Sequence, residues 1–192
     1  MRWRRLSEIV NDFNILVKVK PSLSPDEASK ESMVHYLTKA FMVKYLVDEL
    51  RKEFMENGMG EDDALSKALD CVEAEYPLNS IRLDVYVKPD CGSAFSGLAV
   101  EVETLYGTGT IVHKLLDTIE SRVNVVNRLW IVVPNPQAVI YLPLLLKLRN
   151  HARASHRAKE IEFYTLDLYN GELVRLINVA VIILGSLGAY KA

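Results

Sequence analysis

Two apolar segments that carry acidic residues constrain this chain more than any other feature. Residues 81–87 read Ile-Arg-Leu-Asp-Val-Tyr-Val, and residues 98–104 read Leu-Ala-Val-Glu-Val-Glu-Thr after a turn-rich gap. Such runs are typical of neighbouring strands of one hairpin. Burial of carboxylates in a β-rich core is costly unless a cation or a hydrogen-bonding partner neutralises them. The three acids of this hairpin therefore predict a divalent-metal site.

Strand geometry decides which of these acids can meet. If the strands are 81–88 and about 98–105, Asp84 lies opposite about residue 102, between Glu101 and Glu103. Glu101 and Glu103 are two residues apart and point to one face, and opposed residues lie roughly 5 Å apart at Cβ. Mg²⁺ prefers oxygen ligands and keeps several waters, so two or three carboxylates suffice. The alternative is that the acids form the solvated face of an antiparallel hairpin.

Length and composition indicate one compact α/β protein. The chain has 192 residues, 49% of them hydrophobic, and a formal net charge of −2. We expect an N-terminal helical extension over residues 1–60, packed on an α/β core over residues 61–192. With so little net charge, any nucleic-acid binding requires a local basic patch.

The sequence favours a cytoplasmic protein from a thermophile. No continuous apolar run follows the basic start, and the apolar stretch from Val179 to Leu184 is too short to span a bilayer. We therefore expect no membrane association. A disulfide between the two cysteines, Cys71 and Cys91, is uncommon in the cytoplasm outside hyperthermophiles. The single glutamine, Gln137, favours such a source, since glutamine is thermolabile.

Hydrophobic periodicity predicts alternating helices and strands. Residues 14–20 are expected as a short strand or extended lead-in, and Ser24-Pro25 as the start of a long helix. The predicted helices are 25–57, 61–75, 111–123 and 137–152, and the predicted strands are 81–88, 98–105, 128–134, 160–166 and one or two within 173–184. This order is typical of a mixed sheet flanked by helices.

The chain has an aspartate on one predicted strand and Glu-x-Glu on the next, followed by a helix and a buried strand. This pattern resembles the PD-(D/E)XK (restriction-endonuclease-like) nuclease superfamily. The resemblance covers roughly residues 61–134. It implies an αβββαβ core and Mg²⁺-dependent (or Mn²⁺-dependent) hydrolysis of a phosphodiester in DNA. Asp84 matches the metal-binding aspartate of the family, and Glu101 matches the acidic residue of its E-x-K element. A strand expected by the family before residue 81 is not evident in the sequence.

The chain departs from the family pattern at Glu103, which stands where the motif lysine is usual. Some restriction endonucleases of the superfamily carry glutamate there. Lys114, in the first turns of the next helix, is the candidate to replace that lysine. Either Glu103 or Lys114 would position the attacking water. Asp90, in the literal dipeptide Pro89-Asp90, offers a competing register, but it lies opposite about residue 96 in the turn.

Other charged residues could complete the site. Many members of the family carry a further glutamate on the helix before the sheet, and Glu73 and Glu75 fit that position equally well. A basic run from the late helix into the next loop could follow a phosphate backbone. Its principal members are Arg149, Arg153, Arg157 and Lys159.

Two functions of different classes remain open. The first is a Mg²⁺-dependent DNA nuclease with catalytic residues Asp84, Glu101, Glu103 and Lys114, which dimerises through the long helix. The second is a catalytically inactive nuclease-like scaffold that binds nucleic acid or a protein partner. The absence of the motif lysine favours the scaffold.

Overall fold

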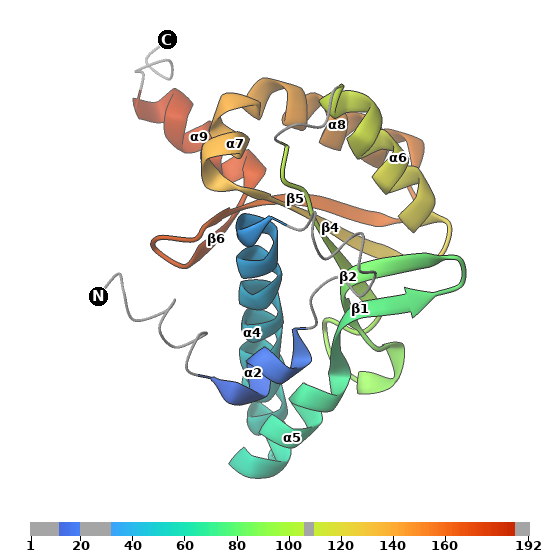
Figure 1. The fold of residues 1–192 in the computed structure, drawn as a ribbon, viewed down its shortest axis with the longest axis vertical. Helices are drawn as coiled ribbons and strands as arrows, with labels where there is room; N and C mark the ends of the chain where they lie inside the picture. Colours follow the sequence, from blue (N-terminus) through green and yellow to red (C-terminus); the bar gives the residue numbers. More distant parts are fainter. Residues whose placement is uncertain (1–11, 20–31, 106–109, 187–192) are drawn as a thin grey trace.

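The computed structural model describes residues 12–19, 32–105 and 110–186 (Figure 1). Its strands form one six-stranded sheet in the order β1-β2-β3-β4-β5-β6. The strands are β1 Val72–Leu78, β2 Ile81–Val87, β3 Leu98–Val102, β4 Arg128–Pro134, β5 Glu160–Asp167 and β6 Glu172–Arg175. Neighbouring pairs are antiparallel except β3–β4 and β4–β5, which are parallel. The sheet is therefore mixed, as predicted.

Helices cover both faces of the sheet. α2, α4 and α5 share one buried cluster with it, and α6, α7, α8 and α9 share the other. Figure 1 shows α4 on one side of the sheet and α6, α7 and α8 on the opposite side. The helices are α2 Phe13–Lys18, α4 Met33–Glu56, α5 Glu61–Cys71, α6 Ile111–Val123, α7 Asn135–Ile140, α8 Leu142–Ser155 and α9 Leu176–Ser186, with a 3₁₀ turn at Pro89–Cys91.

The amphipathic elements agree closely with the sequence patterns. β4 occupies the predicted 128–134, and α6 buries the predicted stripe of Leu115, Ile119 and Val123. Along β3, Leu98 and Val100 face the cluster of α4 while Ala99 faces that of α6. This alternation follows from the twofold period of a strand. Within the described residues, no helix is both long and apolar enough to span a bilayer.

Three predicted elements are wrong. Residues 13–18 form α2 rather than a strand, and the Asp12 side chain caps it by accepting from the Ile15 N–H. The helix predicted over 61–75 ends at Cys71, because Val72 and Ala74 alternate inward as β1 and pair with β2. In the stretch 173–184, where one or two strands were predicted, residues 173–175 do belong to β6, but residues 176–186 form α9, since Leu176 and Ala180 recur at helical spacing.

The predicted helix start at Ser24-Pro25 lies outside the described residues. In the described part, α4 begins at Met33, where Ser32 Oγ accepts from the His35 N–H at 3.1 Å. The expected division at residue 60 remains a prediction. The structure does place α4 against β1, β2 and β3.

Cys71 and Cys91 form a disulfide. Such a bridge is uncommon in cytoplasmic proteins outside hyperthermophiles. Cys71 is the last residue of α5, Cys91 lies in the 3₁₀ turn, and their Cα atoms are 5.6 Å apart. Both side chains are buried. The bridge therefore ties the end of α5 to the connection between β2 and β3, which carry the hairpin acids.

We expect Cys71→Ser/Cys91→Ser to lower the free energy of unfolding by about 3 kcal/mol, because the bridge closes a loop of 20 residues in the unfolded chain. Urea unfolding of the oxidised wild type and the double variant measures the difference. If reduced wild type and the double variant both match the oxidised protein, the bridge does not stabilise the fold.

Candidate functional site

A kink in β1 and β2 places the first acidic residues. Ala74 faces the α4 cluster, but Tyr76, two residues later, faces the α6 cluster. The same switch separates Leu83 from Val85 in β2. Between these pairs Glu75 has φ 53°, a left-handed conformation that is uncommon for residues other than glycine. Backbone conformations of this kind persist where the surrounding structure holds them, often at functional sites.

Asp84 lies at this kink and connects three elements. Its Oδ2 accepts from the Val102 N–H of β3 at 2.7 Å and lies 3.4 Å from His35 Nε2 of α4. Burial raises the pKa of Asp84. This effect is outweighed by the hydrogen bond and charge of His35, by the Val102 N–H and by the charge of Lys39, so the pKa lies below its ordinary value. Asp84 is therefore ionised at neutral pH, and its side chain keeps 19% exposure.

Glu101 is the buried neighbour of Asp84. The β2–β3 register pairs Val85 with Val100, so its next step places Asp84 opposite Glu101. Arg122 of α6 donates to Glu101 Oε2 at 2.9 Å, whereas Oε1 is buried and has no hydrogen-bond partner among the described residues. Burial and the charges of Asp84 and Glu103 outweigh Arg122 and raise the pKa of Glu101 to about 8.

Glu103 lies on the same side of the sheet as Glu101. Its Oε1 accepts from Thr118 Oγ1 at 2.7 Å, and its Oε2 lies 2.8 Å from Lys114 Nζ. The lysine contact is an ion pair without hydrogen-bond geometry, because Oε2 has no such partner among the described residues. Both glutamates are 4% exposed, so the solvated-face alternative is wrong.

The structure separates the two candidates for a further glutamate. Both lie on β1 rather than on the predicted helix. Glu73 is half-buried and pairs with Lys18 at 3.5 Å and Lys88 at 3.3 Å. Glu75 is buried, falls opposite Asp84 in the β1–β2 register, and accepts from Lys39 Nζ at 2.5 Å. Glu75 is therefore the one beside Asp84.

Several cations of the site were missed in the sequence. Lys39 is fully buried, and His35, four residues earlier, lies on the same face of α4. A lysine that precedes the run Ala-Phe-Met-Val is a usable signal for a buried ion pair. On α6, a spacing of four residues places Lys114, Thr118 and Arg122 on one stripe. The partner of each cation could not be predicted, because it lies far away in the sequence.

The predicted basic run lies elsewhere. Arg149 and Arg153 donate to Glu162 of β5, and Lys159 donates to Asn127 Oδ1 and the Val126 carbonyl. Residue 159 precedes β5, whereas the hairpin acids lie at the carboxyl end of β3, which is parallel to β4 and β5. The structure therefore does not bring this run and the acids together. Arg157 is exposed.

Asp90 lies in the 3₁₀ turn between β2 and β3, exposed to solvent. Gly97 N–H donates to the Val87 carbonyl, which closes this connection. The competing register is therefore not that of the hairpin.

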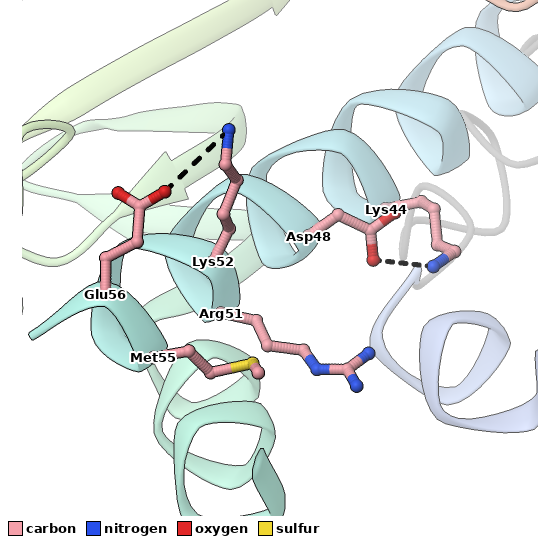
Figure 2. A pocket seen from close by; sticks show the side chains of 6 residues that line it. All are labelled: Lys44, Asp48, Arg51, Lys52, Met55 and Glu56. Atoms are coloured by element: carbon pink, nitrogen blue, oxygen red, sulfur yellow. Dashed lines mark hydrogen bonds and ion pairs between the residues drawn. The ribbon is translucent and has the colours of Figure 1, made fainter. Parts of the chain in front are cut away.

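A surface hollow of about 650 Å³ also runs along the exposed side of α4. Figure 2 shows that its charged side chains pair with one another, Lys44 with Asp48 and Lys52 with Glu56. Arg51, which also lines it, pairs with Glu61 of α5. The charges of the described residues that line the hollow are therefore matched within the chain.

No cluster of three or more His, Cys, Asp or Glu side chains in the described part of the chain is arranged to hold a metal ion. The hairpin acids are instead paired with cations of the protein. The exception is Glu101 Oε1, a buried acceptor without a partner there, next to the ionised Asp84. Asp84 and Glu101 are the described carboxylates that could hold a divalent cation, which would compete with Arg122 for Glu101.

The raised pKa of Glu101 predicts a pH-dependent stability. Between about pH 4.5 and 8 the folded protein keeps a proton that the unfolded chain releases, so the contribution of Glu101 falls as the pH rises. We expect Glu101→Gln to remove up to about 1.4 kcal/mol per pH unit of this decline. Urea unfolding of both proteins in EDTA at several pH values measures this difference. If the free energy of unfolding falls equally with pH in wild type and Glu101→Gln, the pKa of Glu101 is not raised.

No protein-family model matches this chain, and neither a curated protein nor a solved structure matches it. The function proposed below is therefore argued from the geometry of the site.

Proposed function

We propose that this protein is a Mg²⁺-dependent or Mn²⁺-dependent DNA nuclease of the PD-(D/E)XK type. The observation that carries the proposal is that Asp84 falls opposite Glu101 at the end of the β2–β3 ladder, close enough for its charge to raise the pKa of Glu101, while one buried Glu101 oxygen has no hydrogen-bond partner among the described residues. The element order supports it. α5, β1, β2, β3, α6 and β4 follow one another as helix, three strands, helix and strand, and β1 supplies the strand that the sequence did not reveal.

Asp84 and Glu101 would hold the ion, with Glu75 adjacent to Asp84. When bound, the ion lowers the pKa of a coordinated water and neutralises charge that develops on the phosphate. Thr118 and Lys114 hold the carboxylate of Glu103, which would orient the attacking water and accept its proton. Lys114 is 38% exposed, so its ammonium can also face a phosphate.

The experiment is nicking of supercoiled plasmid with Mg²⁺ or Mn²⁺, with and without EDTA, by wild type and Asp84→Ala. Metal-dependent cleavage that is lost in the variant supports the nuclease. Absence of cleavage by wild type with either ion would overturn it.

A nuclease-like scaffold without catalysis is the second candidate. Arg122 already pairs with Glu101, and Lys114 already pairs with Glu103. A protein whose acids are paired in this way can keep the fold without any ion. DNA binding without cleavage in the same assay would favour the scaffold.

The remaining expectations belong to the same proposal. A cytoplasmic location and the disulfide are compatible if the source is a hyperthermophile. The homodimer through the long helix has little support, because α4 buries its apolar middle, Phe41 to Leu50, within its own chain. DNA contact by the basic run stays a prediction.

A further inference from the structure

A second hollow, of about 370 Å³, lies at one edge of the sheet and takes no part in the mechanism above. It is found at the carboxyl ends of the parallel strands β4 and β5, where Pro134 and Leu166 line it. Val34 of α4 and Gln137 of α7 line it as well, and in Figure 1 this end of the sheet lies between α7 and the upper end of α4. Ligands of open α/β sheets bind at this end of parallel strands. Its place and size are therefore those of a ligand pocket.

The hollow is close to the acids of the proposed active site. Glu103 N–H donates to the Val132 carbonyl at 2.9 Å, and Pro134 follows two residues later on the same strand. With about 3.3 Å per residue along a strand and about 4.8 Å between strands, the hollow begins about 8 Å from the backbone of Glu103. A DNA strand with one phosphate at the acids therefore has a neighbouring nucleotide within reach of the hollow.

Gln137 brings a buried polar group to the hollow. It is 1% exposed, and its Oε1 accepts from the Leu105 N–H at 3.0 Å. Because a backbone N–H can only donate, this bond fixes which end of the carboxamide is the oxygen. The amide nitrogen has no hydrogen-bond partner among the described residues, yet it is not fully buried, so it stays accessible from the hollow. Such a donor matches a ligand that carries a carbonyl oxygen or a ring nitrogen as acceptor.

The rest of the lining favours a flat, largely apolar ligand over a phosphate. Among the described lining residues there is no lysine, arginine or histidine, and the charged one is Asp167. Its carboxylate already accepts from the backbone N–H groups of Tyr169 and Asn170 and from the Asn170 side chain. Tyr169 is 53% exposed, and aromatic side chains stack on nucleobases. A nucleobase supplies both the flat face and the acceptor atoms.

We propose that this hollow binds an unpaired nucleobase next to the phosphodiester that is cut, an inference that rests on the proposed nuclease function. The Gln137 amide donates to an acceptor on the edge of the base, and the Tyr169 ring stacks on its face. A base inside a duplex offers neither its face nor its pairing edge, so the nucleotide must leave the stack or belong to a single strand. Gln137 and Tyr169 are thereby specificity residues for unpaired DNA.

The test measures binding of two short, fluorescein-labelled single strands of equal length in EDTA. One strand is oligothymidylate, and the other is made of abasic sites. Both carry the same phosphates, so the ratio of their dissociation constants isolates the contribution of the bases. We expect wild type to bind oligothymidylate about tenfold more tightly than the abasic strand.

Two substitutions should lower this ratio by about fivefold or more. Gln137→Glu keeps an oxygen for the Leu105 N–H but removes the donor, and slightly alkaline buffer keeps the introduced carboxyl ionised. Tyr169→Ala removes the ring, whereas Tyr169→Phe retains it and should keep the wild-type ratio. Asn150→Asp adds the same charge at an exposed position of α8 and is the matched control.

An unchanged ratio in Tyr169→Ala, or in Gln137→Glu that circular dichroism shows to be folded, would overturn the inference. Equal binding of both strands by wild type would overturn it as well. Equal affinity for free thymidine monophosphate and for oligothymidylate would assign the hollow to a free nucleotide and contradict its role in the DNA substrate. These measurements need neither metal nor cleavage, so their failure is distinct from a failure of wild type to nick plasmid.

Discussion

Replacement of Asp84 by asparagine is expected to slow metal-dependent DNA cleavage by at least about 10³-fold while the protein stays folded. Asparagine keeps an oxygen that can accept from the Val102 N–H but removes the negative charge. In the variant, a divalent ion would keep Glu101 as a ligand but lose Asp84. Burial disfavours the charged form of Glu101, so this single carboxylate would bind the ion weakly. Initial rates of plasmid nicking in Mg²⁺ and in Mn²⁺ measure the loss, and circular dichroism checks the fold.

Asp90→Asn is the matched control, since Asp90 is an exposed aspartate in the connection that follows β2. It should cleave within about twofold of wild type, because surface substitutions of this kind change little. If Asp84→Asn retains more than a tenth of the wild-type rate, or if Asp90→Asn is the inactive variant, Asp84 is not the ligand.

The second large effect is expected on stability. Lys39→Met should lower the free energy of unfolding by about 3–5 kcal/mol, because it leaves the buried Glu75 without its counter-charge. Among the described residues, a second cation near Glu75 is Arg82, but it is 4.0 Å away and 44% exposed, so it compensates little. Urea unfolding at pH 7 gives the change.

Two variants distinguish this ion pair from a general effect of losing lysine. Lys52→Met removes a lysine that is 70% exposed on the same helix and should change stability by less than about 1 kcal/mol. Lys39→Met/Glu75→Gln removes both charges and should recover a large part of the loss. If Lys39→Met costs no more than Lys52→Met, the buried pair does not stabilise the packing of α4.

Strong local patterns allowed much of the fold to be predicted. β4 is a continuous apolar run, and α6 has a clear stripe, so both have the predicted limits or nearly so. β1 was missed because Leu65, Leu69, Val72 and Tyr76 also satisfy a helical period, and pairing with β2 decides the conformation of residues 72–78. Tertiary pairing overrides local propensity in such ambiguous runs.

The acids of the site were predictable, but the cations were not. Asp84, Glu101 and Glu103 stand out as charges inside apolar strands, and the twofold period places both glutamates on one face. Which cation meets which acid depends on how α4 and α6 pack across the sheet. The pairs Lys39–Glu75 and Arg122–Glu101 span 36 and 21 residues, so no local spacing specifies them.

Calorimetric titration of the protein with Mn²⁺ at pH 7 tests the central claim most directly. If Asp84 and Glu101 take a divalent ion, we expect one saturable site, with release of up to about one proton per ion, because Glu101 has a pKa of about 8 before the ion binds. Buffers of different ionisation enthalpy reveal the proton, and Glu101→Gln should lose both the proton and most of the affinity. No binding by wild type, or identical binding by Glu101→Gln, would contradict the account.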